Sequence, residues 1–243
     1  MIHGLISDVH ANLEALRAVI SELGDVDDIW FLGDAVGYGP DPQACFEEVS
    51  KSCSRTIAGN HDLGVAGVIG LGRFRYAAAV ACRYSMRELS DEAKQRIGAL
   101  PLTLELDDGV TLTHGSLVDP IWQYVISAAI ADLSFEVADF RVLFVGHSHF
   151  PAVFVKEGEA PCVLLAFEED KPIELGGDTR FIINPGAVGQ PRDGDPRAAY
   201  AIYDDEAQTV TLRRVEYPIA ETRRKMADAM LPGSLAERLS YGL

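Results

Sequence analysis

Three short apolar segments within the first 62 residues each end abruptly in polar side chains. The transitions are Asp8-Val9-His10 after residues 2–7, Gly33-Asp34 after residues 28–32, and Gly59-Asn60-His61-Asp62 after residues 55–58. Helical periodicity occupies the stretches between them, at 13–23 and about 43–49. Such alternation favours a parallel sheet with helices packed on it. Polar groups at the carboxyl ends of such strands face the crevice in which ligands bind.

Two later apolar segments end in the same way. A hairpin pattern over 102–113 leads into His114-Gly115, and the run 142–145 leads into Gly146-His147-Ser148-His149. Five of the six histidines therefore lie where a predicted strand gives way to a loop. A polar turn would explain any one of these segments, but not all of them together. Carboxylates with neutral imidazoles suit a transition-metal ion, and a carboxylate can bridge two ions, so we predict a metal site.

The rest of the chain divides into a helical part and a part made mostly of strands. We expect helices at 73–89 and 91–100, at 127–139, and at 219–230 and 235–239, and strands at 152–156, 162–167, 180–183, 198–203 and 209–215. No linker separates these parts, so we predict one α/β domain over residues 1–243, with 63–100 as a helical insertion near the site. Two mixed sheets, one from each half of the chain, would pack face to face with helices outside.

Charge and composition limit the classes of partner. A net charge of −16 argues against non-specific binding of long nucleic acids, which requires a basic surface. No apolar run approaches the roughly 18 residues of a membrane-spanning helix, and Met1–Ile6 lacks the features of a signal peptide. The four cysteines form no C-x-x-C pair and are expected to be reduced. We therefore expect a cytoplasmic protein without a membrane or long nucleic acid as partner.

Taken together, the polar segments from Asp8 to His149 resemble the motifs of the calcineurin-like metallophosphoesterase superfamily in their order. Asn184-Pro185-Gly186-Ala187-Val188-Gly189 resembles the segment that closes the site in the small bacterial and archaeal phosphodiesterase branch. The resemblance implies a four-layer αββα sandwich and two divalent transition-metal ions, with Mn, Fe, Zn and Ni as candidates. It also implies a ligand set in which Asp8, His10 and His149 hold one ion, Asn60, His114 and His147 hold the other, and Asp34 bridges them.

The resemblance implies hydrolysis of a phosphoester. Two cations about 3.5–4 Å apart can clamp two phosphoryl oxygens and lower the pKa of a bridging water, which then attacks phosphorus. His61 adjoins a ligand without being needed as one, so we predict that it protonates the leaving oxygen; a substrate contact alone is the alternative. Asp62 is predicted to orient the His61 ring, with a surface or helix-capping acid as the alternative.

One departure from the family bears on the substrate. Protein phosphatases and symmetrical dinucleoside tetraphosphatases follow their Gly-Asp motif with an Asp-Arg pair, where this chain has Gly37 and Tyr38. This favours a small phosphodiester, such as a nucleotide derivative, as the substrate. Arg73, Arg75 and Arg192 are candidate substitutes as phosphate contacts, with solvated surface positions as the alternative.

Other functions remain open at this stage. A phosphomonoesterase or a dinucleoside polyphosphatase would use the same ligands. A non-enzymatic scaffold of the same fold, like the metallophosphoesterase-like retromer subunit, is disfavoured because His61 and all seven ligand positions are present. Trp122 and Tyr124 could stack on a base or pack in the core.

Overall fold

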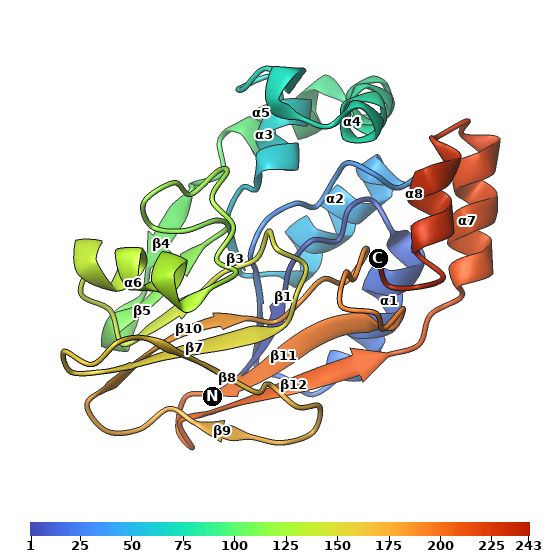
Figure 1. Ribbon diagram of the computed structural model, residues 1–243. Helices are drawn as coiled ribbons and strands as arrows, with labels where there is room; N and C mark the ends of the chain where they lie inside the picture. The colour runs from blue at the N-terminus through green and yellow to red at the C-terminus, as the bar shows by residue number, and fades with distance from the viewer.

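The computed structural model of the protein describes residues 1–243. Two mixed sheets of six strands each lie face to face (Figure 1). The strand order in the first sheet is β3 (Arg55–Thr56), β2 (Asp28–Phe31), β1 (Ile2–Ile6), β11 (Ala198–Asp204), β12 (Thr209–Val215) and β9 (Ile173–Glu174). The order in the second sheet is β4 (Thr103–Glu105), β5 (Val110–Thr113), β6 (Val142–Phe144), β10 (Thr179–Asn184), β7 (Ala152–Glu157) and β8 (Val163–Leu165).

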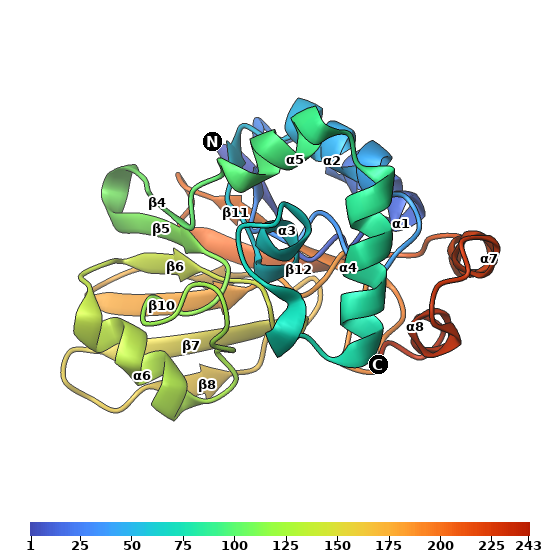
Figure 2. The ribbon, with the colours of Figure 1, turned by 90° about the horizontal axis from the view of Figure 1, so that it is seen from above.

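Helices cover the outer faces of the sheets and one of their edges. In the view from above, α1 (Leu13–Leu23) and α2 (Pro42–Ser52) lie on one side and α6 (Ala128–Val137) on the other (Figure 2). The remaining helices are α3 (Asn60–Val65), α4 (Tyr76–Glu88), α5 (Asp91–Gly98), α7 (Ile219–Asp228) and α8 (Gly233–Arg238), with 3₁₀ turns at Leu71–Arg73 and Asp107–Gly109. No helix is both long and apolar enough to cross a lipid bilayer.

Successive residues of a strand contribute to different cores, which explains the layered architecture. Leu5 belongs to the core between the two sheets, and Ile6 belongs to the core beneath α1 and α2. In β6, Phe144 faces the core between the sheets while Leu143 packs with α6 residues such as Phe135. Because side chains alternate across a strand, runs that are apolar at every position indicate sheets buried on both faces. The expected four-layer αββα sandwich is confirmed.

The prediction that each half of the chain supplies one sheet is wrong. The strands β9, β11 and β12 come from the second half but belong to the first sheet. β11 pairs antiparallel with β1, with Ile2 opposite Asp204. Without β11 the free edge of β1 would leave backbone groups unpaired in the interior, which is costly. Pairing of strands distant in sequence is invisible to local patterns.

Several boundaries also differ from the predictions. The polar segment after β3 is not a turn, because Asn60 begins α3. Helix α4 begins at Tyr76, so that Arg73 lies in a 3₁₀ turn and Arg75 is the N-cap residue. The two-residue strand β9 was not predicted, and β8 is limited to Val163–Leu165.

The parallel strands of both sheets end at a common edge. β1, β2 and β3 are parallel to one another, as are β5, β6 and β10. The carboxyl ends of parallel strands meet, so the residues that follow them are brought together. A hydrogen bond of 2.7 Å between His114 Nδ1 and Leu32 O joins the two sheets at this edge.

Candidate metal centre

The seven predicted ligands converge at the common edge, and each is at most 4% exposed. The potential donor atoms of Asp8, His10 and His149 lie within 4.8 Å of one another, and the same holds for Asp34, His114 and His147. His114 Nε2 lies 3.3 Å from Asp34 Oδ2 and 4.0 Å from Asp8 Oδ1, so the two groups adjoin. A third group consists of His10, Asp34 and His61, so Asp34 belongs to two of the three groups, and the assignment of ligands to individual ions stays a prediction.

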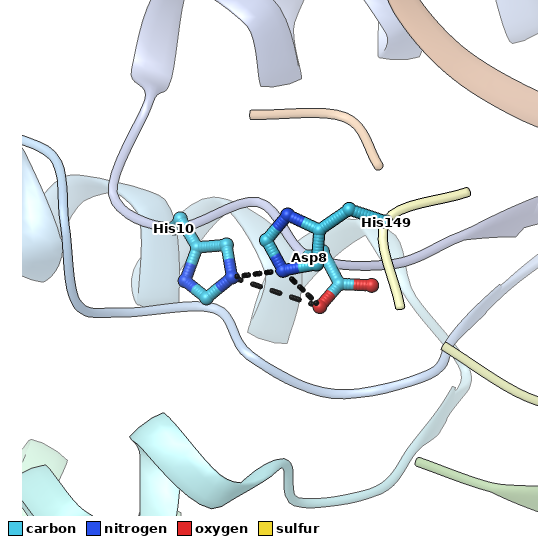
Figure 3. A group of neighbouring side chains, drawn as sticks. All are labelled: Asp8, His10 and His149. Carbon is cyan, nitrogen blue, oxygen red and sulfur yellow. Dashed lines mark hydrogen bonds and ion pairs between the residues drawn. The ribbon is translucent and has the colours of Figure 1, made fainter. Parts of the chain in front are cut away.

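The first group is drawn in Figure 3, where the Asp8 carboxylate and both imidazoles approach a common point. His149 Nε2 lies 3.2 Å from Asp8 Oδ1, and His10 Nε2 lies 3.6 Å from the same oxygen. The two Nε2 atoms are only 3.0 Å apart. Three donor atoms at these separations form one face of a coordination shell.

Backbone carbonyls determine which imidazole nitrogen is free. The Nδ1 atoms of His10, His114 and His149 lie 3.2, 2.7 and 2.6 Å from the carbonyl oxygens of Val36, Leu32 and Gln190. A carbonyl accepts only, so Nδ1 carries the proton and Nε2 of the neutral ring presents a lone pair. Two such lone pairs 3.0 Å apart repel each other, and a cation between them removes the repulsion.

Five polar atoms of the cluster are buried without a hydrogen-bond partner. They are Asp8 Oδ1, Asp34 Oδ2, Asn60 Oδ1, His114 Nε2 and His147 Nε2. Buried polar atoms are almost always paired, because leaving one unpaired costs about 1–3 kcal/mol. All five can donate an electron pair to a metal ion, and oxygen with imidazole nitrogen suits Mn, Fe, Zn or Ni. The residues present therefore fit divalent metal ions.

The other oxygen of each aspartate is held in place by the protein. Asp8 Oδ2 accepts hydrogen bonds from Ser7 Oγ at 2.7 Å and from His147 N at 3.0 Å. Asp34 Oδ1 accepts one from His61 N at 2.8 Å. Each carboxylate is thus oriented with one oxygen free, as a metal ligand requires.

The backbone around the cluster is strained. Asp8, His10, Asp34, His147 and His149 all have φ between 48° and 66°, in the left-handed region. Non-glycine residues rarely adopt this conformation, and each instance costs about 1–3 kcal/mol. Left-handed residues at the strand ends turn the side chains back toward the edge of the sheets. The strain therefore serves the convergence of the ligands.

Burial and neighbouring charges set the protonation of the ligands. Burial lowers the pKa of His147 to about 3 and that of His149 to about 4, so both rings are neutral. Burial is the largest influence on His114 as well, but the Asp34 and Asp8 carboxylates and the Leu32 carbonyl together outweigh it and raise the pKa of His114 to about 9. In the metal-free protein this pKa places a second proton on the ring, at Nε2, and a bound cation beside Asp34 would displace that proton and leave the neutral ring as a ligand.

His61 lies beside the cluster, but its ring partner is not the one predicted. Asp62 does not contact the ring: its Oδ2 accepts from Asp34 N at 2.7 Å and Gly59 N at 3.1 Å. The expectation that Asp62 orients His61 is wrong, and the alternative of a helix-capping acid is confirmed. At N3 of α3, the Asp62 side chain points back to the helix start and the loop after β2, so it cannot reach the ring.

The partner of the His61 ring is Cys82 in α4, whose Sγ lies 3.4 Å from Nδ1. Burial raises the pKa of this thiol, which therefore stays protonated and can donate to Nδ1. Burial also holds the pKa of His61 well below its ordinary value, although Asp34 opposes the shift. A neutral ring that accepts from the thiol at Nδ1 carries its proton on Nε2. No sequence pattern connects Cys82 with His61.

The position of Gly37 leaves no room for an acidic side chain next to the His61 ring. Its φ is +87°, and a Cβ at this position would lie 2.3 Å from His61 Nδ1. The Asp of the phosphatase branches therefore has no room here while the ring keeps its position. Tyr38 follows, with its ring centroid 4.4 Å from that of His61 and 4.6 Å from that of His10.

Loss of the Cys82 thiol should reduce turnover without removing metal. A single hydrogen bond contributes about 0.5–1.5 kcal/mol, so Cys82→Ala should lower kcat about 2- to 10-fold, and Cys82→Ser should lose less. The control is Cys45→Ala, which truncates another buried cysteine, on the buried face of α2. Steady-state kcat, measured where thermal melts show all three variants folded, is the readout. Equal kcat for Cys82→Ala and Cys45→Ala would show that the thiol does not position His61.

A pocket of about 520 Å³ opens over the cluster. Asp34, Asn60, His61, His147 and His149 line its floor. The predicted substrate contacts Arg73, Arg75 and Arg192 line it as well, together with Trp122, Tyr124, Phe74, Tyr38 and Arg238. Trp122 and Tyr124 are thus pocket residues: Tyr124 stacks on His147 with centroids 4.0 Å apart, and Arg73 lies 4.5 Å above the Trp122 ring. Arg238 was not predicted, since nothing in its local sequence marks it.

Comparison with known proteins identifies the family. Residues 1–208 match a sequence profile described as "Calcineurin-like phosphoesterase superfamily domain". The chain belongs to this superfamily. It is a phosphoester hydrolase of a metal-dependent family, and its Asp and His cluster can hold the metal.

Relatives of the phosphoesterase include proteins with and without a named activity. An uncharacterised protein of Methanocaldococcus jannaschii is 37% identical over 98% of this chain and 97% of that one. A symmetrical bis(5'-nucleosyl)-tetraphosphatase of Chromohalobacter salexigens is 26% identical over 83% and 78% of the two chains. The crystal structure of a metallophosphoesterase from Sphaerobacter thermophilus is 44% identical, covers 100% of this chain and 99% of that one, and has a TM-score of 0.90.

Proposed function

We propose that the protein is a phosphodiesterase that uses two divalent metal ions to hydrolyse a small substrate. The observation that carries the proposal is the set of five buried, unpartnered donor atoms, three of which belong to the pocket-lining residues Asp34, Asn60 and His147. In this assignment Asp8, His10 and His149 hold one ion. Asn60, His114 and His147 hold the other, and Asp34 lies between the two groups, within reach of both His10 and His114.

The two ions, when bound, would supply charge stabilisation to the phosphoryl oxygens and a nucleophile derived from water. The chain contributes the rest. His61 lies at the pocket, and we propose that its imidazolium form protonates the leaving oxygen. Burial favours the neutral ring in the free protein, whereas the negative charge of a phosphate bound beside the ring would favour the imidazolium. Arg192, held at Nη2 by Gln190 Oε1 at 3.0 Å, lines the same pocket.

Preference for a diester follows from the region around Gly37. A monoester dianion carries more charge on its oxygens than a diester and gains more from a bidentate arginine fork. No Asp-Arg pair follows Asp34 in this chain, and Arg192 is already engaged with Gln190 and, at 3.4 Å, with the Tyr38 hydroxyl. A diester carries less charge on its phosphoryl oxygens, so its hydrolysis loses less when no arginine fork is present.

The test compares bis(p-nitrophenyl) phosphate with p-nitrophenyl phosphate at the same metal and pH. We expect kcat/KM to be higher for the diester by about tenfold, which corresponds to about 1.4 kcal/mol of transition-state stabilisation. The same ratio of kcat/KM values, measured for Arg192→Ala, separates the contribution of this arginine to substrate preference from that of the metal ions. Arg17→Ala, on the exposed side of α1, is the control. A clear monoester preference in the wild type would instead support a phosphomonoesterase.

A dinucleoside polyphosphatase is the second candidate. It is favoured by the four arginines that line the pocket and by the named activity of the Chromohalobacter relative. An internal phosphate of such a substrate carries two substituents, as a diester does. Product analysis by anion-exchange chromatography with diadenosine tetraphosphate, cyclic nucleotides and simple diesters distinguishes the two.

A further inference from the structure

Two arginines from distant parts of the chain meet in the pocket without an acidic partner. Gln190 Oε1 accepts from Arg192 Nη2 at 3.0 Å and from Arg238 Nη1 at 3.4 Å, although Gln190 and Arg238 are 48 residues apart. Both arginines are half-buried and line the pocket. One neutral oxygen therefore holds two guanidinium groups close together.

The acids nearest in sequence to Arg192 are used elsewhere. Asp193 pairs with Arg214, and Asp195 pairs with Arg197 at 2.7 Å. Neither Arg192 nor Arg238 forms an ion pair with any carboxylate, in a chain that has 37 acidic and 21 basic residues. Where acids are this abundant, unpaired arginines in a pocket indicate a site kept for an external anion.

Holding these groups together is unfavourable in the free protein. Burial, and then the charges of Arg192 and Arg75, lower the pKa of Arg238 below its ordinary value. Such mutual repulsion is relieved when an anion with several oxygens binds between the guanidinium groups. Arg75, the exposed N-cap residue of α4, borders the same pocket.

The arginine pair lies beside the metal centre but is distinct from it. The Tyr38 ring packs against His10 and His61 on one side, and its hydroxyl accepts from Arg192 at 3.4 Å. Arg238 is on the far side of Arg192 from Tyr38 in this chain of contacts. It belongs to α8, which follows the segment matched by the family profile in the sequence. The second arginine thus comes from a segment that lies outside the residues matched by the family profile.

We propose that Arg192, Arg238 and Arg75 form a second phosphate subsite, which binds a phosphate group of the substrate other than the one that is hydrolysed. The inference rests on the proposed function and deepens it. The enzyme accordingly prefers substrates with at least two phosphate groups, one over the metal ions and one at the arginines. Simple diesters with a single phosphate use only part of the pocket.

Two matched substrates test this inference. They are thymidine 5'-(p-nitrophenyl phosphate) and the same compound with an added 3'-phosphate, which differ only in the second anion. We expect the metal-loaded wild type to have a kcat/KM roughly 10- to 100-fold higher for the compound with the 3'-phosphate, as expected for charged hydrogen bonds. Arg238→Ala should remove most of this preference and leave hydrolysis of the single-phosphate compound nearly unchanged.

The control is Arg223→Ala in α7, which removes an equal charge near α8 but outside the pocket. It should retain the preference. Equal rates for both substrates in the wild type, or equal losses on both in Arg238→Ala, would overturn the subsite. Arg238→Lys, which keeps the charge but not the fork, should give an intermediate preference.

A binding measurement separates failure of the subsite from failure of the proposed function. If neither ester is hydrolysed, the phosphodiesterase proposal fails. Calorimetric titration of the metal-loaded protein then compares thymidine 3',5'-bisphosphate with thymidine 5'-phosphate. Tighter binding of the bisphosphate that is lost in Arg238→Ala supports the subsite, and equal affinities refute it.

Discussion

Replacing Asp34 by alanine should remove at least one of the two ions proposed above and lower kcat/KM by about 1000-fold or more. Asp34 is the carboxylate whose free oxygen adjoins both groups of ligands, at 3.7 Å from His10 Nε2 and 3.3 Å from His114 Nε2. A dinuclear centre contributes several kcal/mol to catalysis, and each ~1.4 kcal/mol lost is a factor of ten in rate. Elemental analysis by mass spectrometry counts the ions per chain.

Thermal melts provide a second readout that does not depend on turnover. A metal that binds only the folded protein raises its melting temperature, so the wild type should be stabilised by added Mn²⁺ and the Asp34→Ala variant much less. Asp139→Ala, which removes a fully exposed acid, should match the wild type in both respects. Two ions per chain in the Asp34→Ala variant would refute the bridging role.

Replacing His61 by alanine should leave the metal content of the wild type unchanged and lower kcat about 10²- to 10⁴-fold, the usual contribution of a positioned general acid. The loss should be greatest for a phenyl ester and smaller for a p-nitrophenyl ester, because p-nitrophenolate leaves with little need of a proton. Steady-state kinetics on diesters with leaving groups of graded pKa measure this dependence.

Two outcomes would contradict the acid role of His61. Equal losses on good and poor leaving groups would make His61 a substrate contact. A loss of metal would make it a ligand, since the His61 ring also lies with His10 and Asp34 in a group whose donor atoms are within 4.8 Å of one another. His61→Asn, which keeps a hydrogen-bond donor, should bind metal as well as the wild type does and recover little of the rate.

The sequence by itself was enough to predict the four-layer fold class, the family and the buried polar residues that converge at the candidate metal centre. The predicted ligands lie within a few residues of the ends of β1, β2, β3, β5 and β6. A run of alternating or fully apolar residues is a local pattern, so the end of each strand could be predicted from the sequence. Asp8 and Asp34 could therefore be placed at one edge before the tertiary structure was known.

Only the tertiary structure decided the features that depend on contacts between distant segments. The pairing of β11 with β1, the contact of Cys82 with His61 and the meeting of Arg238 with Arg192 join residues far apart in the chain. Asp62 was misplaced for a related reason, because the direction of its side chain depends on the helix that begins at Asn60. Local periodicity indicates which face of a helix or strand is buried. Which residues pack against that face depends on the fold of the whole chain.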